Sequence, residues 1–223
     1  MEPLQVSFHL SEAMILSHTS ARLLTLDDLL AAASYQETGD LRAGDSLPLE
    51  RLAHPNGQWV YKASTWRAVE SLYVEPTTIY KRTSAIALEH FGLDKKWDRG
   101  RGMTKDYELT YHRYLTPAIR FYCVGDRTEI DRLAGHLQFI GKKRSLRAGQ
   151  IWKHEVIPSE QDRSLVDGTY VTRPIPVALA GAWKGVHQMV GYRSPYWHFD
   201  NHTLCVVPVL GPQIEEEDTI HAT

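Results

Sequence analysis

The sequence contains no long hydrophobic run. None of its apolar stretches approaches the ~20 residues that a helix needs to cross a bilayer, and its N-terminal stretch lacks the cationic, apolar and small-residue parts of a signal peptide. Cysteine is equally scarce, since Cys123 and Cys205 are the only two, and both lie in apolar, strand-like segments. We therefore expect two buried thiols, no membrane partner and a reducing cytoplasm.

A strong net charge of either sign is also missing. The 223 residues hold 25 Lys and Arg against 27 Asp and Glu, a formal net charge of -2, so bulk charge does not mark a nucleic-acid partner. The charges are unevenly distributed, however, because acid gathers in residues 215–218 and base between Lys142 and Lys153. A local basic stripe can bind a polyanion even when the whole protein is nearly neutral.

Several nucleotide-binding and catalytic motifs are absent. Gly135 and Gly141 are one residue too far apart for a P-loop, and no G-x-G-x-x-G or G-x-S-x-G sequence occurs. His198 and His202 flank Asp200, but no H-x-x-x-H helix or C-x-x-C frame accompanies them. We therefore expect no nucleotide cofactor and no metal site.

The most distinctive stretch is a basic loop, residues 141–149, that begins and ends with glycine. It follows a helix-like segment, precedes a strand-like one and contains no carboxylate. Its candidate RNA-binding residues are Gly141, Lys142, Lys143, Arg144, Ser145 and Arg147. One interpretation is a phosphate clamp, because glycine lets the backbone approach a ligand and the cations neutralise phosphates. The other is a solvated helix C-cap at Gly141 followed by a basic turn.

Hydrophobic periodicity predicts alternating strands and helices. Apolar residues at every second position predict four strand segments, over residues 4–10, 58–66, 106–124 and 150–157. Pro117 forces the third segment into a break or an edge position. Apolar stripes at helical spacing predict one helix over residues 25–34, capped by Thr25, and another capped by Asp126. The resulting order is the ferredoxin-like α+β pattern, with two helices on one face of an antiparallel sheet.

Between the second and third strands lies an arm, residues 67–105, without clean periodicity. Its candidate RNA-binding cations are Lys81, Arg82, Lys95, Lys96, Arg99 and Arg101. One interpretation is a surface insertion with internal salt bridges, because four acids balance much of the charge. The other is a mobile arm that grips a nucleic-acid strand by charge and by stacking on its aromatic residues.

Residues 1–157 thus form the predicted ferredoxin-like domain, with the arm inserted in it. Residues 158–223 are punctuated by Pro and Gly, predict short strands over 169–179 and 203–210, and contain the aromatic loop 191–197. Because ~65 residues would make only a marginal core, we expect them to be an extension packed on the first domain and ending in an acidic tail.

Three of these segments together resemble a known family. They are Leu26-Asp27-Asp28-Leu29-Leu30 in the first helix, the long arm, and the basic loop with its flanks from Ile140 to Ile151. The chain resembles the repeat-associated mysterious protein (RAMP) superfamily of CRISPR systems, and within it the Cas five-like subunit of type IV effector complexes. Pro195-Tyr196-Trp197 after Gly191-Tyr192 is also similar to that subfamily.

The resemblance implies a guide-RNA-binding subunit that caps one end of a ribonucleoprotein filament. Such subunits bind the 5′ handle of the crRNA, and their thumb, here residues 67–105, separates the handle from the spacer. The basic loop would face the handle. The implied neighbours are the backbone filament subunit, the large subunit, the helicase of type IV systems and the nearby target DNA.

The resemblance also implies an enzymatic alternative. Some relatives cut repeat RNA without a metal ion, and such chemistry needs a general base near the 2′-OH and a cation on the phosphate. Residues of the right type are Tyr61, Lys62, His9 and His112, but nothing in their spacing joins them into a site. We therefore expect a non-catalytic RNA-binding subunit, with a metal-independent endoribonuclease as the alternative.

Overall fold

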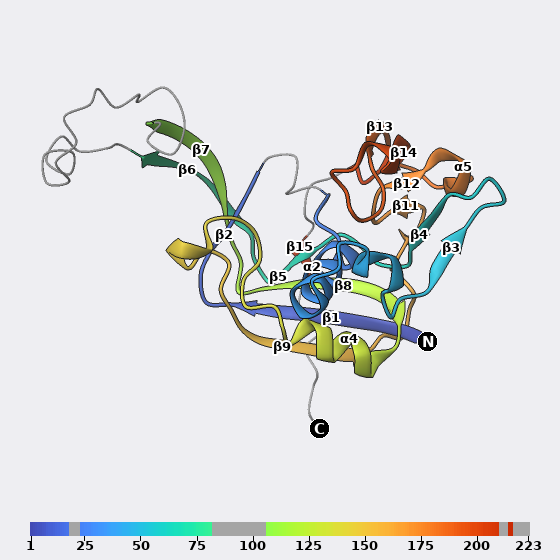
Figure 1. Ribbon diagram of the computed structural model, residues 1–223, viewed down its shortest axis with the longest axis horizontal. Coiled ribbons are helices and arrows are strands. Elements are labelled where there is room, and N and C mark those ends of the chain that lie inside the picture. The colour runs from blue at the N-terminus through green and yellow to red at the C-terminus, as the bar shows by residue number, and fades with distance from the viewer. Residues whose placement is uncertain (18–22, 82–105, 210–213, 216–223) are drawn as a thin grey trace, which may run out of the picture.

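The computed structural model describes residues 1–17, 23–81, 106–209 and 214–215. It is a mixed fold of mostly antiparallel sheets with few helices (Figure 1). No helix in these ranges is both long and apolar enough to cross a membrane. Five of the candidate cations lie outside the described residues, namely Arg82, Lys95, Lys96, Arg99 and Arg101.

A central five-stranded sheet positions the other elements. Its strands lie in the order β15 (Ile214–Glu215), β5 (Arg67–Val69), β8 (Ala118–Gly125), β1 (Glu2–Leu10) and β9 (Ile151–Pro158). Neighbouring strands are antiparallel except for β15 and β5, which are parallel. The predicted first and last strands correspond to β1 and β9, so both predictions are confirmed.

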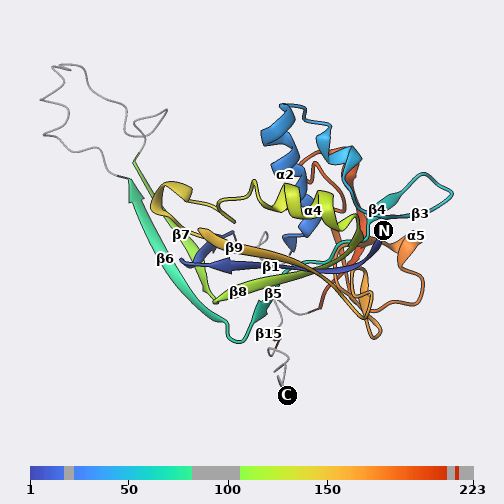
Figure 2. The same ribbon diagram turned by 90° about the horizontal axis from the view of Figure 1, so that it is seen from below.

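Two helices, α2 (Leu26–Thr38) and α4 (Arg127–Ala134), cover one face of this sheet (Figure 2). Leu4, Val6 and Phe8 of β1 are fully buried in the core that these helices share with the sheet. The alternation expected for β1 is therefore confirmed. The apolar stripes expected on the two helices are buried in the same core, which confirms them as well.

The predicted helix caps differ in outcome. Asp126 caps α4 as expected, because its Oδ1 accepts a hydrogen bond from the N–H of Glu129 at 3.1 Å. The Glu129 carboxylate accepts a hydrogen bond from Arg132, and the N–H of Asp126 donates to the carbonyl of Pro48. Thr25 precedes α2 but its side chain makes no cap, so that prediction is wrong.

The predicted strand over residues 58–66 is confirmed only in its second half, where Ala63 bridges Cys123 of β8 and the N–H of Ser64 donates to the carbonyl of Tyr122 at 2.8 Å. Its first half is β4 (Trp59–Tyr61), which forms a separate hairpin with β3 (Arg51–Ala53). The regular pairing with β8 continues in β5, at the start of the predicted arm. Period-two alternation marks a strand in either place. Trp66, which directly precedes β5, is buried with its ring centroid 5.7 Å from that of Tyr114.

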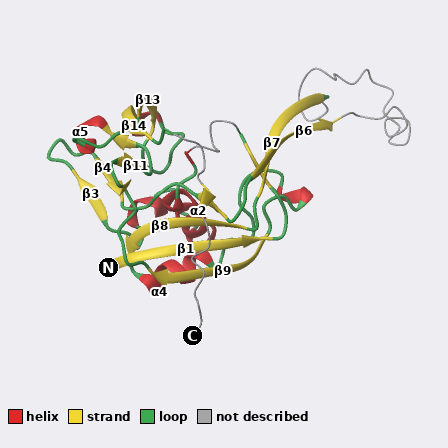
Figure 3. Ribbon diagram, turned by 180° about the vertical axis from the view of Figure 1, so that it is seen from behind, coloured by secondary structure: helices red, strands yellow, loops and turns green. Residues whose placement is uncertain are grey.

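A long antiparallel hairpin of β6 (Tyr73–Lys81) and β7 (Tyr107–Leu115) projects from the central sheet (Figure 3). β2 (Met14–Leu16) pairs with β7, which gives a three-stranded sheet in the order β2-β7-β6. The break expected at Pro117 is confirmed, because β7 ends before it and β8 belongs to the central sheet. Lys81 lies at the end of β6 that leads to residues 82–105.

The C-terminal part forms two small sheets of its own. One pairs β10 (Val166–Asp167) with β11 (Tyr170–Val171), and the other has the order β12 (Ile175–Pro176), β14 (His202–Val207), β13 (Val186–Gly191). A continuous strand over 169–179 is wrong, because Pro174 and Pro176 have no N–H to donate to a ladder and the short helix α5 (Val177–Ala180) follows. Three short 3-10 turns complete the described residues, η1 (Ala43–Ser46), η3 (Arg144–Leu146) and η4 (Phe199–Asn201).

The two cysteines are buried free thiols, as expected. Cys123 lies in the main core, and Cys205 lies in a second apolar cluster beneath the C-terminal sheet. Burial raises the pKa of Cys123 far above its ordinary value and that of Cys205 to about 12. Both are therefore protonated and unreactive at neutral pH.

Candidate nucleic-acid interface

The basic loop, residues 141–149, is closed at its neck by backbone hydrogen bonds. The N–H of Ile140 donates to the carbonyl of Gly149 at 2.9 Å. The N–H groups of Lys142 and Gly149 donate to Ile15 at 2.8 Å and to Ala13 at 3.0 Å. Because these last two acceptors lie in β2 and just before it, the loop is fastened to one side of the β2-β7-β6 sheet.

Glycine is required at both ends of the loop. Gly141 has φ +95° and Gly149 has φ +67°, in the left-handed region that other residues rarely adopt. A Cβ at Gly141 would also approach the carbonyl oxygen of Ile15 to 2.7 Å. Gly141 does not cap a helix, since α4 ends at Ala134 with Gly135 as its C-cap. The C-cap interpretation of this loop is therefore wrong.

We expect Gly149→Ala to destabilise the fold by more than about 2 kcal/mol, because its Cβ would collide with the Ile140 carbonyl and its φ is positive. Urea unfolding followed by tryptophan fluorescence measures the change. Gly168→Ala is the matched control, since Gly168 has φ +59° but nothing within 4 Å of an added Cβ. If both variants lose the same free energy of unfolding, the close approach of the added Cβ to the Ile140 carbonyl does not contribute to the destabilisation.

The tip of the loop presents cations to solvent. Lys143 (φ +64°) and Arg147 (φ +60°) flank η3 in left-handed conformations, which cost about 1 kcal/mol or more each and are typical of binding sites. Lys142, Arg144, Ser145 and Arg147 are exposed. Within the described residues, no ion pair joins a carboxylate to any of the four cations of the loop, Lys142, Lys143, Arg144 and Arg147.

The loop faces two tyrosines of β7. The Nζ of Lys143 lies 5.2 Å from the ring centroid of Tyr111 and 5.4 Å from that of Tyr107, and the Nζ of Lys142 lies 5.9 Å from Tyr111. The Nζ of Lys81 lies 5.9 Å from the other tyrosine, Tyr107. These five residues, here called the lysine–tyrosine cluster, unite cations of the predicted loop and arm that are far apart in the sequence.

Tyr107 and Tyr111 were not predicted from the sequence to be part of the site. Their separation of four residues carries a usable signal, because side chains at even spacing on one strand share a face of the sheet. Lys81 pairs directly with Tyr107 across the hairpin, so it lies on that face as well. The position of the basic loop over this face depends on its bonds to Ala13 and Ile15, which no sequence pattern indicated.

The four residues considered for RNA cleavage are not brought together. Tyr61 is fully buried, and its hydroxyl donates to the carbonyl of Gly44 at 3.1 Å. Lys62 lies beside Val124 at one end of β8, whereas His9 pairs with Ala118 at the other end. Six residues of strand separate these ends by about 20 Å. The fourth residue, His112, lies on β7 in a different sheet.

The histidines around η4 form hydrogen-bonded loop structure. The Nδ1 of His198 lies 3.6 Å from Oδ2 of Asp200, and the Nδ1 of His202 lies 2.9 Å from the backbone oxygen of His198. Over the ranges that the structure describes, no three His, Cys, Asp or Glu side chains are grouped so that they could hold a metal ion.

A buried ion pair joins the C-terminal part to α2. Asp27 and Arg173 are both fully buried, with Nη1–Oδ1 and Nη2–Oδ2 distances of 3.1 and 3.3 Å. The hydroxyl of Tyr196 accepts a hydrogen bond from Arg173 and donates one to Asp27, both at 2.8 Å. Arg173 also donates to the backbone carbonyls of Tyr61, Ala63 and Tyr192.

This network was not foreseen from the sequence. Asp27 was noted only as part of the motif Leu26-Asp27-Asp28-Leu29-Leu30, and Arg173 was not singled out, because no pattern links residues so far apart in the chain. Burial disfavours the charged form of Arg173, but Asp27 and Tyr196 together more than offset this and raise the pKa of the guanidinium above its ordinary value. The pair anchors the aromatic loop 191–197 through Tyr196.

A comparison with protein families identifies the class of protein. Residues 2–208 match a family of proteins associated with type IV CRISPR systems. The family is described as CRISPR type IV associated protein Csf3, and the chain belongs to it. The resemblance to the Cas five-like proteins of type IV CRISPR systems is therefore confirmed. No curated protein matches the chain. Membership in this family indicates a role in a type IV CRISPR complex alongside other subunits.

Proposed function

We propose that the chain is a non-catalytic guide-RNA-binding subunit of a type IV CRISPR ribonucleoprotein. It binds the 5′ handle of the crRNA and caps one end of the filament. The observation that carries this proposal is the lysine–tyrosine cluster, where three cations from two separate segments converge on two aromatic rings of one strand.

The cluster has the chemistry that single-stranded RNA requires. Proteins hold such RNA by placing cations on its phosphates and by stacking its bases on aromatic side chains. Tyr107 and Tyr111 are partly exposed, and the ammonium groups lie 5.2 to 5.9 Å from their ring centroids. Arg144, Ser145 and Arg147 at the exposed tip extend the same surface with two further cations and a hydroxyl.

A ferredoxin-like core with a thumb belongs to this proposal. The strand order β9-β1-β8-β5, with α2 and α4 on one face, supports the core. The β6–β7 hairpin supports the thumb, since it projects from the sheet and its strands lead to and from residues 82–105. We assign residues 1–157 to this RAMP domain and residues 158–223 to a C-terminal extension.

The proposed partners follow from this role. The crRNA contacts the basic loop, and the backbone filament subunit and the large subunit lie next to the chain in the assembled complex. The helicase of type IV systems joins later, and the target DNA lies nearby. We place this assembly in the cytoplasm.

The proposal is tested by expressing the chain with its genomic neighbours, purifying the complex and sequencing its RNA. We expect one uniform small RNA whose 5′ end is a fixed fragment of the CRISPR repeat, because a handle-binding subunit selects that end. Random RNA, or no RNA, in a complex that contains the chain would contradict the proposal.

The non-catalytic part needs a separate control. Repeat RNA incubated with the pure chain in EDTA is expected to remain intact, because Lys62 and His9 lie at opposite ends of β8. A discrete cleavage product would favour the metal-independent endoribonuclease instead. Retention of activity by the variant that combines Tyr61→Phe, Lys62→Ala, His9→Ala and His112→Ala would then exclude these four residues as its source.

A further inference from the structure

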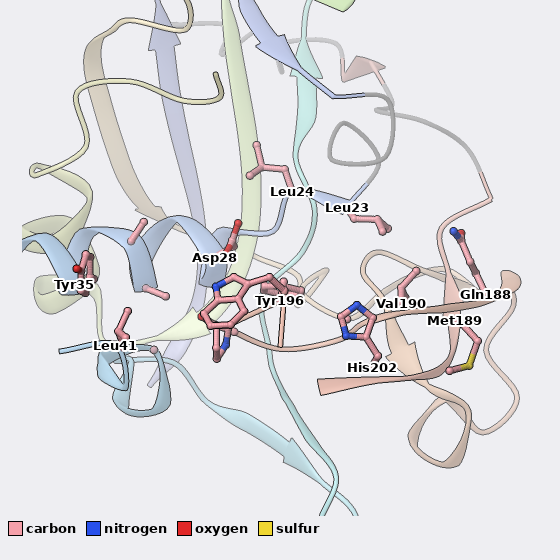
Figure 4. A pocket seen from close by; sticks show the side chains of 17 residues that line it. Leu23, Leu24, Asp28, Tyr35, Leu41, Gln188, Met189, Val190, Tyr196 and His202 are labelled. Atoms are coloured by element: carbon pink, nitrogen blue, oxygen red, sulfur yellow. The ribbon is translucent and has the colours of Figure 1, made fainter. Parts of the chain in front are cut away.

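A pocket of about 590 Å³ lies between α2 and the C-terminal sheet, and none of its lining residues belongs to the basic loop. Figure 4 shows side chains from α2 and its flanks on one side and from β13 and β14 on the other. Its lining is largely apolar and includes Leu23, Leu24 and Val190. Met189 and Trp197 also line it, although 64% and 73% of their surfaces are exposed. Large apolar side chains that lie uncovered beside a pocket are a feature of binding sites.

The pocket contains a single carboxylate, Asp28, and no Lys or Arg among its lining residues. The neighbouring Asp27 is neutralised by Arg173. In contrast, no residue of the described ranges donates a hydrogen bond to the Asp28 carboxylate or forms an ion pair with it. A half-buried charge is stabilised by such a partner, so within the described residues the pocket has a requirement for a cation that is not met.

The occupant that meets this requirement is a basic protein side chain. The aliphatic stem of Arg or Lys packs on apolar walls while its charged end reaches a carboxylate, and the rings of Tyr35 and Trp197 offer cation–π contacts. RNA fits poorly, because its phosphates would find no lining cation and would be repelled by Asp28.

We propose that this pocket is a protein-docking site that receives an Arg or Lys side chain, flanked by apolar residues, from another subunit of the complex. The apolar flanks of the partner segment cover Met189 and Trp197, and its cation pairs with Asp28. This surface is separate from the RNA-binding surface proposed above and has a different partner.

The acid–base behaviour of Asp28 agrees with this assignment. Burial, and secondarily the negative Asp27, raise the pKa of Asp28 from 3.8 to about 6. Because the folded chain binds this proton more tightly than the unfolded chain, the ionised form destabilises the free chain above that pH. Docking of a cation needs the ionised form, so it weakens as pH falls through 6. The other titratable side chains that line the pocket are Tyr35, Tyr196 and His202.

The test places a photo-crosslinker, p-benzoylphenylalanine, at Met189 in the complex assembled from the full set of subunits. We expect crosslinks to one protein segment that carries an Arg or Lys within a few residues of the crosslinked position. Asp28→Asn should lower the crosslinked fraction roughly tenfold, while raising the urea midpoint of the free chain at pH 7.5. A residue with only a structural role would not produce this opposite pair of effects.

Asp200→Asn is the control, because Asp200 is an exposed carboxylate that does not line the pocket. It should leave the crosslinked fraction unchanged. Crosslinks to RNA, crosslinks within the same chain, no crosslinks, or a fraction insensitive to Asp28→Asn would each overturn the proposal. Because RNA capture is measured separately in the same preparations, a failure here can be distinguished from a failure of the RNA-binding role.

Discussion

Replacing Lys142, Lys143 and Arg144 together by glutamate is expected to weaken binding of single-stranded repeat RNA by at least about 100-fold, because three phosphate contacts become three repulsions. The fold should survive, since within the described residues none of the three side chains forms an ion pair. Filter binding or fluorescence anisotropy with the isolated chain measures the affinity, and circular dichroism checks the fold.

A charge-matched control separates the basic loop from net charge. The control replaces Lys62, Arg132 and Lys153 by glutamate, which also changes the net charge by six units. Each of these three cations is paired with a carboxylate elsewhere on the surface. Their reversal should reduce affinity less than about threefold, since long-range charge is screened in salt. Equal losses for the two triple variants would refute a specific role for the loop.

The salt dependence gives an independent measure of the same contacts. Alanine at the three loop positions should reduce the slope of log affinity against log salt by about 2, which is the value for three phosphate contacts on a single strand. Binding that is strong but independent of salt would instead favour a protein-interaction module with an incidentally basic loop. An unchanged slope would remove these three side chains from the interface.

Replacing Arg173 by methionine should destabilise the fold by about 3–5 kcal/mol, the usual cost of leaving a buried charge without its partner. The Asp27 carboxylate would lose both of its guanidinium contacts, and the carbonyls of Tyr61, Ala63 and Tyr192 would lose their donor. Urea unfolding with tryptophan fluorescence measures this change. A loss below about 1 kcal/mol would show that water or another donor replaces the guanidinium.

The double variant Asp27→Leu with Arg173→Met tests the origin of this cost. Two apolar side chains of similar volume leave no unpaired charge, so the double variant should recover most of the stability lost by Arg173→Met alone. If the double variant is no more stable than the single one, the hydrogen bonds of Arg173 to the backbone, rather than its pairing with Asp27, hold the C-terminal part in place.

Local patterns predicted those elements that bury one regular face. The alternation of Leu4, Val6 and Phe8 located β1, and the apolar stripe beside Asp126 located α4, because each pattern corresponds to one face against the same core. Over residues 58–66 the same method predicted a strand but not its neighbours. Trp59 and Tyr61 alternate as well as any strand of the central sheet, yet they belong to a separate hairpin, and only the stretch around Ala63 pairs with β8. Alternation reports that a segment is a strand but does not report which neighbour accepts its hydrogen bonds.

The residues of the candidate interface were likewise predicted only in part from the sequence. The sequence identified Gly141 to Arg147, since clustered cations between glycines form a local signal. It did not identify Tyr107 and Tyr111 as the rings beneath them. Nor did it show that Lys81 lies on the same surface, because that depends on hairpin pairing and on the bonds that fasten the loop to Ala13 and Ile15.

By itself, the sequence determined the family, the main apolar positions of the first core and the basic character of one loop, because each of these is encoded by neighbouring residues. Only the tertiary structure decided that Arg173 neutralises Asp27 and that Asp28, the next residue, has no such partner in the described part of the chain. The two aspartates are neighbours in sequence, but successive residues of a helix point about 100° apart, so Asp27 is buried and Asp28 is half-buried. Which of them gains a buried partner is set by Arg173, more than a hundred residues away, whose approach no local pattern records.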